Sequence, residues 1–369
     1  MGKVCCIFNI PSLYREKIYL DIDKAYDCDW YFEQEENGIN LFDTNKLQKA
    51  YILSHGKFIS RFYRMKGLVS MVWKHKEYDK YLMVGTPMCV SLWLLCILLK
   101  MFRPKKKIYF WTHGWYGKET FAERVIKKNF LKLADELFIY GNYAKNLLVK
   151  EGFSADRMHV IHNSLSYDVQ IMLRKQMKIT SVYTEHFGND FPVLIFIGRL
   201  TPVKQLHMLI QSVADLKKEN KHYNLVFIGD GPMRADLEKK AGELSISENV
   251  WFYGACYDET INAELVYNAD LCVAPGNVGL TAMHTLMFGC PVITHNDFRF
   301  QMPEFEAITS NKTGDFFERG NQKSLDNVIS KWFQMNGNQR DSIRTLCYKE
   351  IDEQWNPYFQ MDVIKQVFN

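Results

Sequence analysis

Short apolar runs alternate with helix-like patterns along most of this chain of 369 residues. Runs of about four to eight apolar residues indicate buried strands, whereas apolar residues that recur every three or four positions indicate helices. Strands are expected near residues 3–9, 28–32, 50–54, 80–84, 107–111, 136–140, 158–161, 193–198, 224–229, 249–253, 271–274, 291–294 and 315–317. Helices are expected near residues 13–24, 58–75, 89–102, 119–133, 142–150, 204–219, 233–243, 258–267, 279–288 and 322–335. This alternation predicts an α/β fold with mostly parallel sheets that carry helices on both faces.

A polar segment from Tyr167 to Asp190 interrupts the alternation and divides the chain into two halves of similar pattern. We therefore expect a first domain at residues 1–170 and a second domain at residues 185–350, both of ordinary length for a domain. In open α/β sheets, ligands bind at the carboxyl ends of the strands. The loops that follow the strands are therefore the candidates for functional residues.

Composition excludes a disordered chain, because 47% of the residues are hydrophobic and 14% are aromatic. The net charge is only +4, and we expect no nucleic-acid partner. The nine cysteines are odd in number and irregularly spaced, without a zinc-binding pattern. Such cysteines are typical of reduced, buried thiols. With no visible signal peptide, this usage favours a cytoplasmic protein.

The longest apolar stretch, from Met88 to Leu99, is well short of the ~20 residues that span a bilayer. A basic segment follows at residues 100–107, and a second helix-like segment from Phe121 to Lys132 carries four basic residues. Two interpretations stay open for the apolar stretch. It is either a core helix of the sheet or a helix that lies on anionic lipid, and the second would place the protein peripherally on the inner face of the cell membrane.

The most informative segment runs from Ala274 to Ile293, where a strand, a glycine turn, a helix, a second glycine turn and a second strand follow one another. A glycine turn that leads into a helix offers free backbone N–H groups to an anion, above all a phosphate. The residues of this turn are Val278, Gly279, Leu280 and Thr281.

This segment resembles the donor-binding motif of retaining glycosyltransferases with the GT-B fold, in particular family 4 (group 1). The family usually carries two glutamates eight positions apart, and Gly276 and His284 stand in their places here. The resemblance implies two Rossmann-like domains with a cleft between them. It also implies that the first domain binds the acceptor and the second the donor, and that a last helix at about 352–369 crosses back to the first domain.

A second stretch, from Gly198 through Arg199 to Lys204, resembles the Gly-Arg-x-x-x-x-Lys-Gly motif of the same family, with Gln205 in place of the last glycine. In the family the two cations hold the donor diphosphate. Fixed cations would stabilise the charge that grows on the leaving diphosphate as the glycosidic bond breaks. The alternative interpretation is that an arginine and a lysine at a turn between a strand and a helix are ordinary surface charges without a ligand.

Further residues match family positions beside the nucleotide or the sugar. The predicted nucleotide-binding positions are Gly229, Gly231, Tyr253, Gly254 and His284. In the first domain, His113 follows a strand and resembles a histidine that faces the donor sugar in the family, although a packed structural role is the alternative. Weaker candidates for contact with donor sugar or acceptor are Gly114, Trp115, Asn277 and Glu304. Glu304 and Glu306 lie on a polar loop, where glutamates are more often solvated.

The resemblance therefore implies a hexosyl or related glycosyltransferase, with His113, Arg199 and Lys204 as catalytic residues. We expect no metal and no cofactor, only a UDP- or GDP-linked sugar as co-substrate. The reason is that no Asp-x-Asp pattern is placed where it would act as a set of metal ligands. The acceptor is expected to be a saccharide or a lipid-linked saccharide in bacterial capsule or lipopolysaccharide synthesis, with retention of configuration. The alternatives are a catalytically inactive nucleotide-sugar-binding or scaffold protein and, with less support, a phosphorylase or epimerase of the same fold.

Overall fold

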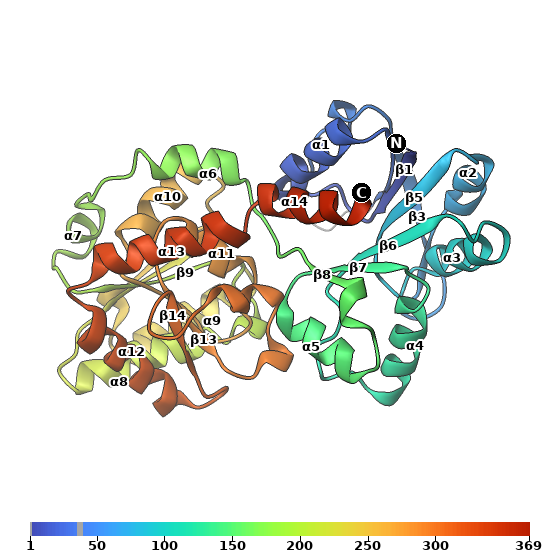
Figure 1. Cartoon of the computed structure of the whole chain (residues 1–369). Helices are drawn as coiled ribbons and strands as arrows, with labels where there is room; N and C mark the ends of the chain where they lie inside the picture. Colours follow the sequence, from blue (N-terminus) through green and yellow to red (C-terminus); the bar gives the residue numbers. More distant parts are fainter. Residues whose placement is uncertain (1, 35–39) are drawn as a thin grey trace. The chain divides into compact units, whose positions relative to one another are not determined.

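The computed structural model describes residues 2–34 and 40–369, and the chain divides into two compact units (Figure 1). The first unit comprises Met1–Ser166 together with Pro357–Asn369, and the second comprises Tyr167–Asn356. Each unit has its own sheet, so each is described separately.

The sheet of the first unit has eight strands in the order β4-β3-β2-β1-β5-β6-β7-β8. The strands are β1 (Lys3–Phe8), β2 (Cys28–Gln34), β3 (Ala50–Lys57), β4 (Tyr63–Met65), β5 (Tyr78–Val84), β6 (Lys107–Thr112), β7 (Glu136–Ile139) and β8 (Met158–Val160). All neighbouring strands are parallel except β3 and β4. From β1 the chain adds β2, β3 and β4 on one side of this strand and then β5 to β8 on its other side. The strand order therefore reverses between β1 and β5.

The helices of the first unit cover both faces of this sheet. They are α1 (Glu16–Ala25), α2 (Leu68–Lys74), α3 (Val90–Phe102), α4 (Phe121–Leu131), α5 (Asn142–Lys150) and α14 (Pro357–Phe368). The C-terminal helix α14 packs beside α1, and its Phe368 ring lies 5.3 Å from the ring of Tyr26 and 4.7 Å from that of Tyr109, between centroids. The crossing helix expected at about 352–369 therefore begins at Pro357.

The helix predicted at residues 58–75 is wrong in its first half. An edge strand, β4, lies there and pairs antiparallel with β3, and α2 begins only at Leu68. Gly67 has φ of 81°, a left-handed conformation that separates the strand from the helix.

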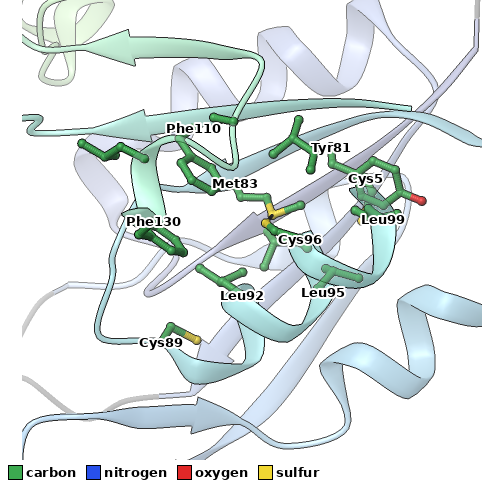
Figure 2. Packing of buried hydrophobic residues seen from close by; sticks show 14 of the residues in the cluster. Cys5, Tyr81, Met83, Cys89, Leu92, Leu95, Cys96, Leu99, Phe110 and Phe130 are labelled. Atoms are coloured by element: carbon green, nitrogen blue, oxygen red, sulfur yellow. Dashed lines mark hydrogen bonds between the residues drawn. The ribbon is translucent and has the colours of Figure 1, made fainter. Parts of the chain in front are cut away.

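The apolar helix α3 is buried on one face and exposed on the other. Figure 2 shows Leu92, Leu95, Cys96 and Leu99 on the side of α3 that faces the sheet, with Cys96 near Met83 and Leu99 beside Cys5. The opposite face exposes Leu94, Ile97, Met101 and Phe102, at 49%, 41%, 66% and 64%. The helix is thus a core element that also presents an apolar surface to solvent. Within the described residues, none of the helices combines the length and apolarity needed to cross a membrane.

The sheet of the second unit has six strands, all parallel, in the order β11-β10-β9-β12-β13-β14. The strands are β9 (Val193–Ile197), β10 (Asn224–Ile228), β11 (Val250–Gly254), β12 (Leu271–Ala274), β13 (Val292–His295) and β14 (Gly314–Phe317). The helices are α6 (Tyr167–Arg174), α7 (Val182–Phe187), α8 (His207–Lys218), α9 (Arg234–Glu243), α10 (Glu259–Asn268), α11 (Leu280–Met287), α12 (Gln322–Asn336) and α13 (Arg340–Gln354). The sequence pattern did not predict α13, which packs on α11 within this unit. Here the strand order reverses between β9 and β12.

Candidate functional site

In the second unit, the loops after β9 and β12 leave neighbouring strands in opposite directions. Ligands of open α/β sheets bind at such a reversal, outside the carboxyl ends of the two strands. The loop after β9 carries Gly198, Arg199 and Lys204, and the loop after β12 carries residues 276–279. The topology therefore brings the two stretches that the sequence singled out to the same edge of the sheet.

Lys204 is fixed between these two loops. Its Nζ donates hydrogen bonds to the backbone oxygen of Asn277 at 2.7 Å and to Oδ1 of Asn277 at 2.9 Å. Burial lowers the pKa of Lys204 to about 8, and the nearby Glu304 opposes this shift. The ammonium group is therefore held in place at a site where an additional anion would stabilise its charge.

Gly276 is glycine because the loop after β9 lies directly against it. Its N–H donates to the backbone oxygen of Lys204 at 2.9 Å. A Cβ atom at this position would lie 2.0 Å from the backbone oxygen of Val203 and 2.7 Å from Cα of Lys204. The glutamate that the related motif carries here therefore has no room in this arrangement.

Arg199 is exposed, and within the described residues its side chain makes no hydrogen bond or ion pair. It follows Gly198, whose N–H donates to Ile228 at the end of β10 at 2.9 Å. The guanidinium is thus available to a ligand at the same edge as Lys204.

Helix α11 begins at this edge, where Gly279 precedes it with φ of 55°. The hydroxyl of Thr281 donates to the backbone oxygen of Ile197 at 2.8 Å and so ties the helix start to β9. The N–H of Val278 is already used, because it donates to Oε1 of Gln301 at 2.9 Å. Any anion at the helix start would therefore meet the N–H groups that follow Val278, those of Gly279, Leu280 and Thr281.

Gln301 is a buried side chain that the sequence analysis did not single out. Its Nε2 donates to Oγ1 of Thr294 at 2.8 Å and to the backbone oxygen of His295 at 3.1 Å. These contacts join β13 to the turn before α11. The only signal in the sequence that could have identified Gln301 is its position shortly after the segment from Ala274 to Ile293.

A carboxylate that the sequence analysis also overlooked lies beside His284. Nε2 of His284 is 2.9 Å from Oε1 of Glu259, the first residue of α10, and Gln170 donates to the same oxygen at 2.7 Å. Burial alone would raise the pKa of Glu259, but the hydrogen bonds from His284 and Gln170 lower it below its usual value. An ionised carboxylate thus accompanies the histidine that stands where the family has its second glutamate.

The glycines after β10 are required by close backbone packing. A Cβ at Gly229 would lie 2.0 Å from the backbone oxygen of Gly198, and one at Gly231 would lie 2.5 Å from that of Leu200. The N–H of Gly229 donates to Gly254 at the end of β11 at 2.8 Å, next to Tyr253. These residues therefore hold the loops of three neighbouring strands together at the candidate site.

Glu304 is not a solvated loop residue. It lies in a short 3-10 helix at Pro303–Ala307 and is 2% exposed. Glu306, two residues later, is only half-buried. Glu304 is near enough to Lys204 to raise its pKa, so its charge helps to keep the lysine protonated.

The first unit has a cavity of about 380 Å³ at the reversal between β1 and β5. His113 and Gly114 line it, as do Arg15 after β1 and Lys127 of α4. Trp115, a candidate for ligand contact, instead packs in the hydrophobic cluster of this unit and is 3% exposed. Trp115 therefore holds the loop after β6 in place and does not face the cavity.

His113 is held neutral. Burial lowers its pKa to about 3, and the charges of Arg15 and Lys127 act in the same direction. Its ring lies 4.6 Å from the ring of Tyr140, between centroids, and its Nδ1 has no hydrogen-bond partner among the described residues. The imidazole is thus suited to a hydrogen bond with a ligand and not to carrying charge.

Comparisons with known proteins bear on the family and the fold of the chain. Residues 183–346 match the family model of the glycosyl transferases group 1. These residues lie within the second unit, which is therefore similar to the glycosyl transferases group 1. Over the whole chain, the solved structure of Anabaena HepE in complex with UDP superposes with a TM-score of 0.74 at 16% identity and covers 99% of both chains. The predicted GT-B fold is therefore confirmed.

Two curated relatives match parts of the chain. A GDP-mannose-dependent phosphatidylinositol dimannoside mannosyltransferase of Mycobacterium tuberculosis is 36% identical over 104 residues, 27% of this chain and 26% of its own length. An uncharacterized protein of the cps region of Klebsiella pneumoniae is 26% identical over 224 residues, 59% of this chain and 53% of its own length. The chain thus matches only about a quarter to a half of these relatives.

The backbone contact at Gly276 leads to a stability prediction. Gly276→Ala should lower the free energy of unfolding by about 1–3 kcal/mol, because the added methyl group forces the loop after β9 to move. Gly242→Ala is the matched control, since its Cβ would meet only Ser247 Oγ at 3.8 Å on an exposed helix, and alanine is favoured over glycine by up to ~1 kcal/mol there. Urea unfolding of the full chain measures both. A Gly276→Ala protein as stable as the parent would contradict the packing.

Proposed function

We propose that this protein is a glycosyltransferase that transfers a sugar from a nucleotide-diphosphate sugar to an acceptor. The observation that carries the proposal is the placement of Lys204, which is partly buried and bonded to Asn277 beside the start of α11, in a unit that is similar to the glycosyl transferases group 1. A lysine, an exposed arginine and a helix N-terminus at one edge form a site for a diphosphate. The complex of HepE with UDP supports the same ligand class.

The leaving diphosphate gains negative charge as its bond to the sugar breaks. Lys204 and Arg199 would stabilise this charge without a metal ion: Lys204 is held by Asn277 before the reaction begins, and the exposed Arg199 is available to the diphosphate. Among the described residues no group of three or more His, Cys, Asp or Glu side chains is placed to hold a metal. We propose retention of configuration, with acceptor attack on the face of the departing diphosphate and an oxygen of that diphosphate as the base.

The nucleotide would be held without the two family glutamates. We propose that His284 and Glu259 together bind the ribose hydroxyls, because the ionised carboxylate accepts hydrogen bonds and the imidazole fixes its position. The sugar would then contact Asn277 and backbone groups, since Gly276 offers no side chain. UDP- and GDP-linked hexoses are the candidate donors.

For the acceptor we propose a saccharide, free or lipid-linked, in the synthesis of a bacterial cell-surface polysaccharide. The two curated relatives support this class, because one is named for a phosphatidylinositol dimannoside acceptor and the other for a cps region. The cavity at His113 in the first unit is the candidate acceptor site, as it has aromatic walls and a neutral imidazole.

The function is tested by turnover of a panel of UDP- and GDP-hexoses by the full chain. At least one donor should be hydrolysed or transferred, and Lys204→Ala and Arg199→Ala should each lower kcat/KM by about 100-fold or more, the usual effect of removing a group that stabilises the transition state. His284→Ala and Glu259→Gln should weaken binding of the nucleotide. Lys323→Ala, at an exposed ion pair on α12, is the control. Tight nucleotide binding without turnover of any donor would instead establish an inactive binding protein of the same fold.

Nucleotide binding should depend on pH through Lys204. Without ligand its pKa is about 8, so the lysine is protonated below pH 8 and loses its charge above it. The Kd of UDP should therefore rise above pH 8, by up to about tenfold per pH unit. In Lys204→Arg the Kd should stay constant between pH 7.5 and about 9.5, because arginine keeps its proton. Calorimetric titration measures both, and a constant Kd in the parent protein would exclude Lys204 from the phosphate site.

We also propose that α3 and α4 dock the first unit on anionic lipid. Both helices pack on one hydrophobic cluster. In addition to the exposed apolar face of α3, helix α4 exposes Phe121 at 83% and Val125 at 44%. Lys105 and Lys107 follow α3, and Arg124 and Lys128 lie on α4. Exposed apolar side chains beside basic ones are typical of an interfacial helix surface.

Sedimentation with phosphatidylglycerol vesicles tests the docking surface. Met101→Asp with Phe121→Asp should reduce vesicle binding by at least about tenfold, since burying each side chain is worth roughly 1.5–3 kcal/mol. Tyr257→Asp, at a residue that is 85% exposed in the second unit, is the matched control. Equal binding by the double variant and the parent would refute the surface.

A further inference from the structure

The cavity of the first unit contains a charged side chain that no part of the proposed donor chemistry uses. Arg15 ends a short 3-10 helix, Leu13–Arg15, directly after β1. Its guanidinium lies 5.5 Å from the ring centroid of Tyr14, 5.8 Å from that of Trp111 and 5.6 Å from that of Tyr140. Aromatic faces attract a cation but do not neutralise it, so the charge of Arg15 stays in the cavity.

The hydrogen-bonding capacity of Arg15 is only partly used. One terminal nitrogen donates to the hydroxyl of Tyr140. Its Nε is buried and makes no hydrogen bond of normal geometry among the described residues, and the neutral hydroxyl of Tyr19 lies beside the guanidinium. No carboxylate of the described residues forms an ion pair with this guanidinium. A buried donor without a partner and a half-buried charge without a counter-charge both cost free energy unless a ligand supplies what is missing.

The rest of the cavity wall has the same character. The lining residues that are described include Arg15 and Lys127 but no aspartate or glutamate. Lys127 is already neutralised, because its Nζ lies 2.8 Å from Oε1 of Glu119. His113 adds an unpartnered Nδ1 to the same cavity. Arg15 is therefore the uncompensated charge of this site.

We propose that the cavity binds an anionic group of the acceptor, a phosphate or a carboxylate, and that Arg15 is the residue that holds it. The planar guanidinium of arginine matches either group with two parallel hydrogen bonds. The assignment rests on the proposed glycosyltransferase function, in which Lys204, Arg199 and the start of α11 hold the donor diphosphate in the second unit. The acceptor is accordingly an acidic saccharide, such as a sugar phosphate or a uronic acid, with its ring against the aromatic wall.

The surroundings of Arg15 favour a ligand that is both anionic and a sugar. Tyr14, Tyr116 and Trp111 present rings to the cavity, and such rings pack against the apolar faces of sugars while their polar atoms serve the hydroxyls. A volume of about 380 Å³ accommodates a monosaccharide with one acidic substituent. Inorganic anions should bind as well, but more weakly, because they leave the aromatic wall uncovered.

The test is direct binding to the full chain, followed by ligand-observed NMR and calorimetry, with no turnover required. The probes are inorganic phosphate, glucose 1-phosphate, methyl glucuronide and the neutral methyl glucoside, and UDP serves as a probe of the donor site. The acidic sugars should bind the parent at least about tenfold more tightly than methyl glucoside. Arg15→Gln should abolish this preference, Arg15→Lys should restore part of it, and the Kd of UDP should be the same in all three proteins.

Arg61→Gln is the matched control, because Arg61 is an exposed arginine of the same unit that pairs with Glu123, and it should change nothing. Unchanged UDP binding and an unchanged melting temperature show that Arg15→Gln is folded. If Arg15→Gln weakens UDP instead, the cation serves the donor diphosphate and the proposal is wrong. It is also wrong if no acidic probe binds, or if acidic and neutral sugars bind alike.

Failure of the catalytic proposal would look different from failure of this one. A protein that turns over no donor, yet binds acidic sugars through Arg15, would retain the anionic site without the transferase activity. A protein that turns over donors but shows no preference for acidic ligands would retain the transferase activity without this site.

Discussion

The candidate site of the second unit depends on one backbone contact, the hydrogen bond from the N–H of Gly276 to the backbone oxygen of Lys204. This contact joins the loops that follow β9 and β12, the two strands between which the strand order reverses. It brings Nζ of Lys204 within reach of Asn277, and it leaves no space for a side chain at position 276. The absent glutamate and the fixed lysine are therefore consequences of the same packing.

The acidic groups near this contact come from other elements. Glu304, from the 3-10 helix after β13, raises the pKa of Lys204, which burial lowers. Glu259, from α10, lies beside His284. Each carboxylate is balanced by a basic side chain, so the unit can bury charge without leaving it isolated. If this edge binds the proposed donor, the positions of these charge pairs, which differ from those of the related motif, would select the ligand.

The sequence predicted the alternation of strands and helices closely, because buried strands and amphipathic helices have periods that can be read locally. It failed at residues 58–75, where pairing of β4 with β3 overrides the helical pattern, and it assigned no helix to α13. The contacts of Arg15, Glu259 and Gln301 join segments far apart in the chain, and a single sequence contains no signal for them. Trp115 is a prediction of the opposite kind. Its place next to His113 and Gly114 made it a candidate for ligand contact, but its ring is buried in the core.

Both units place a cation at the reversal of strand order, but the two cations differ in chemistry. The charge of Lys204 depends on its surroundings, because burial brings its pKa to about 8 and a bound anion would raise it again. Arg15 keeps its charge in any surroundings. A lysine suits a diphosphate whose charge grows during the reaction, since it responds most strongly to the most highly charged state. An arginine suits a group that stays chemically unchanged, so the anion of the acceptor would serve to position the reacting hydroxyl and would take no part in bond making.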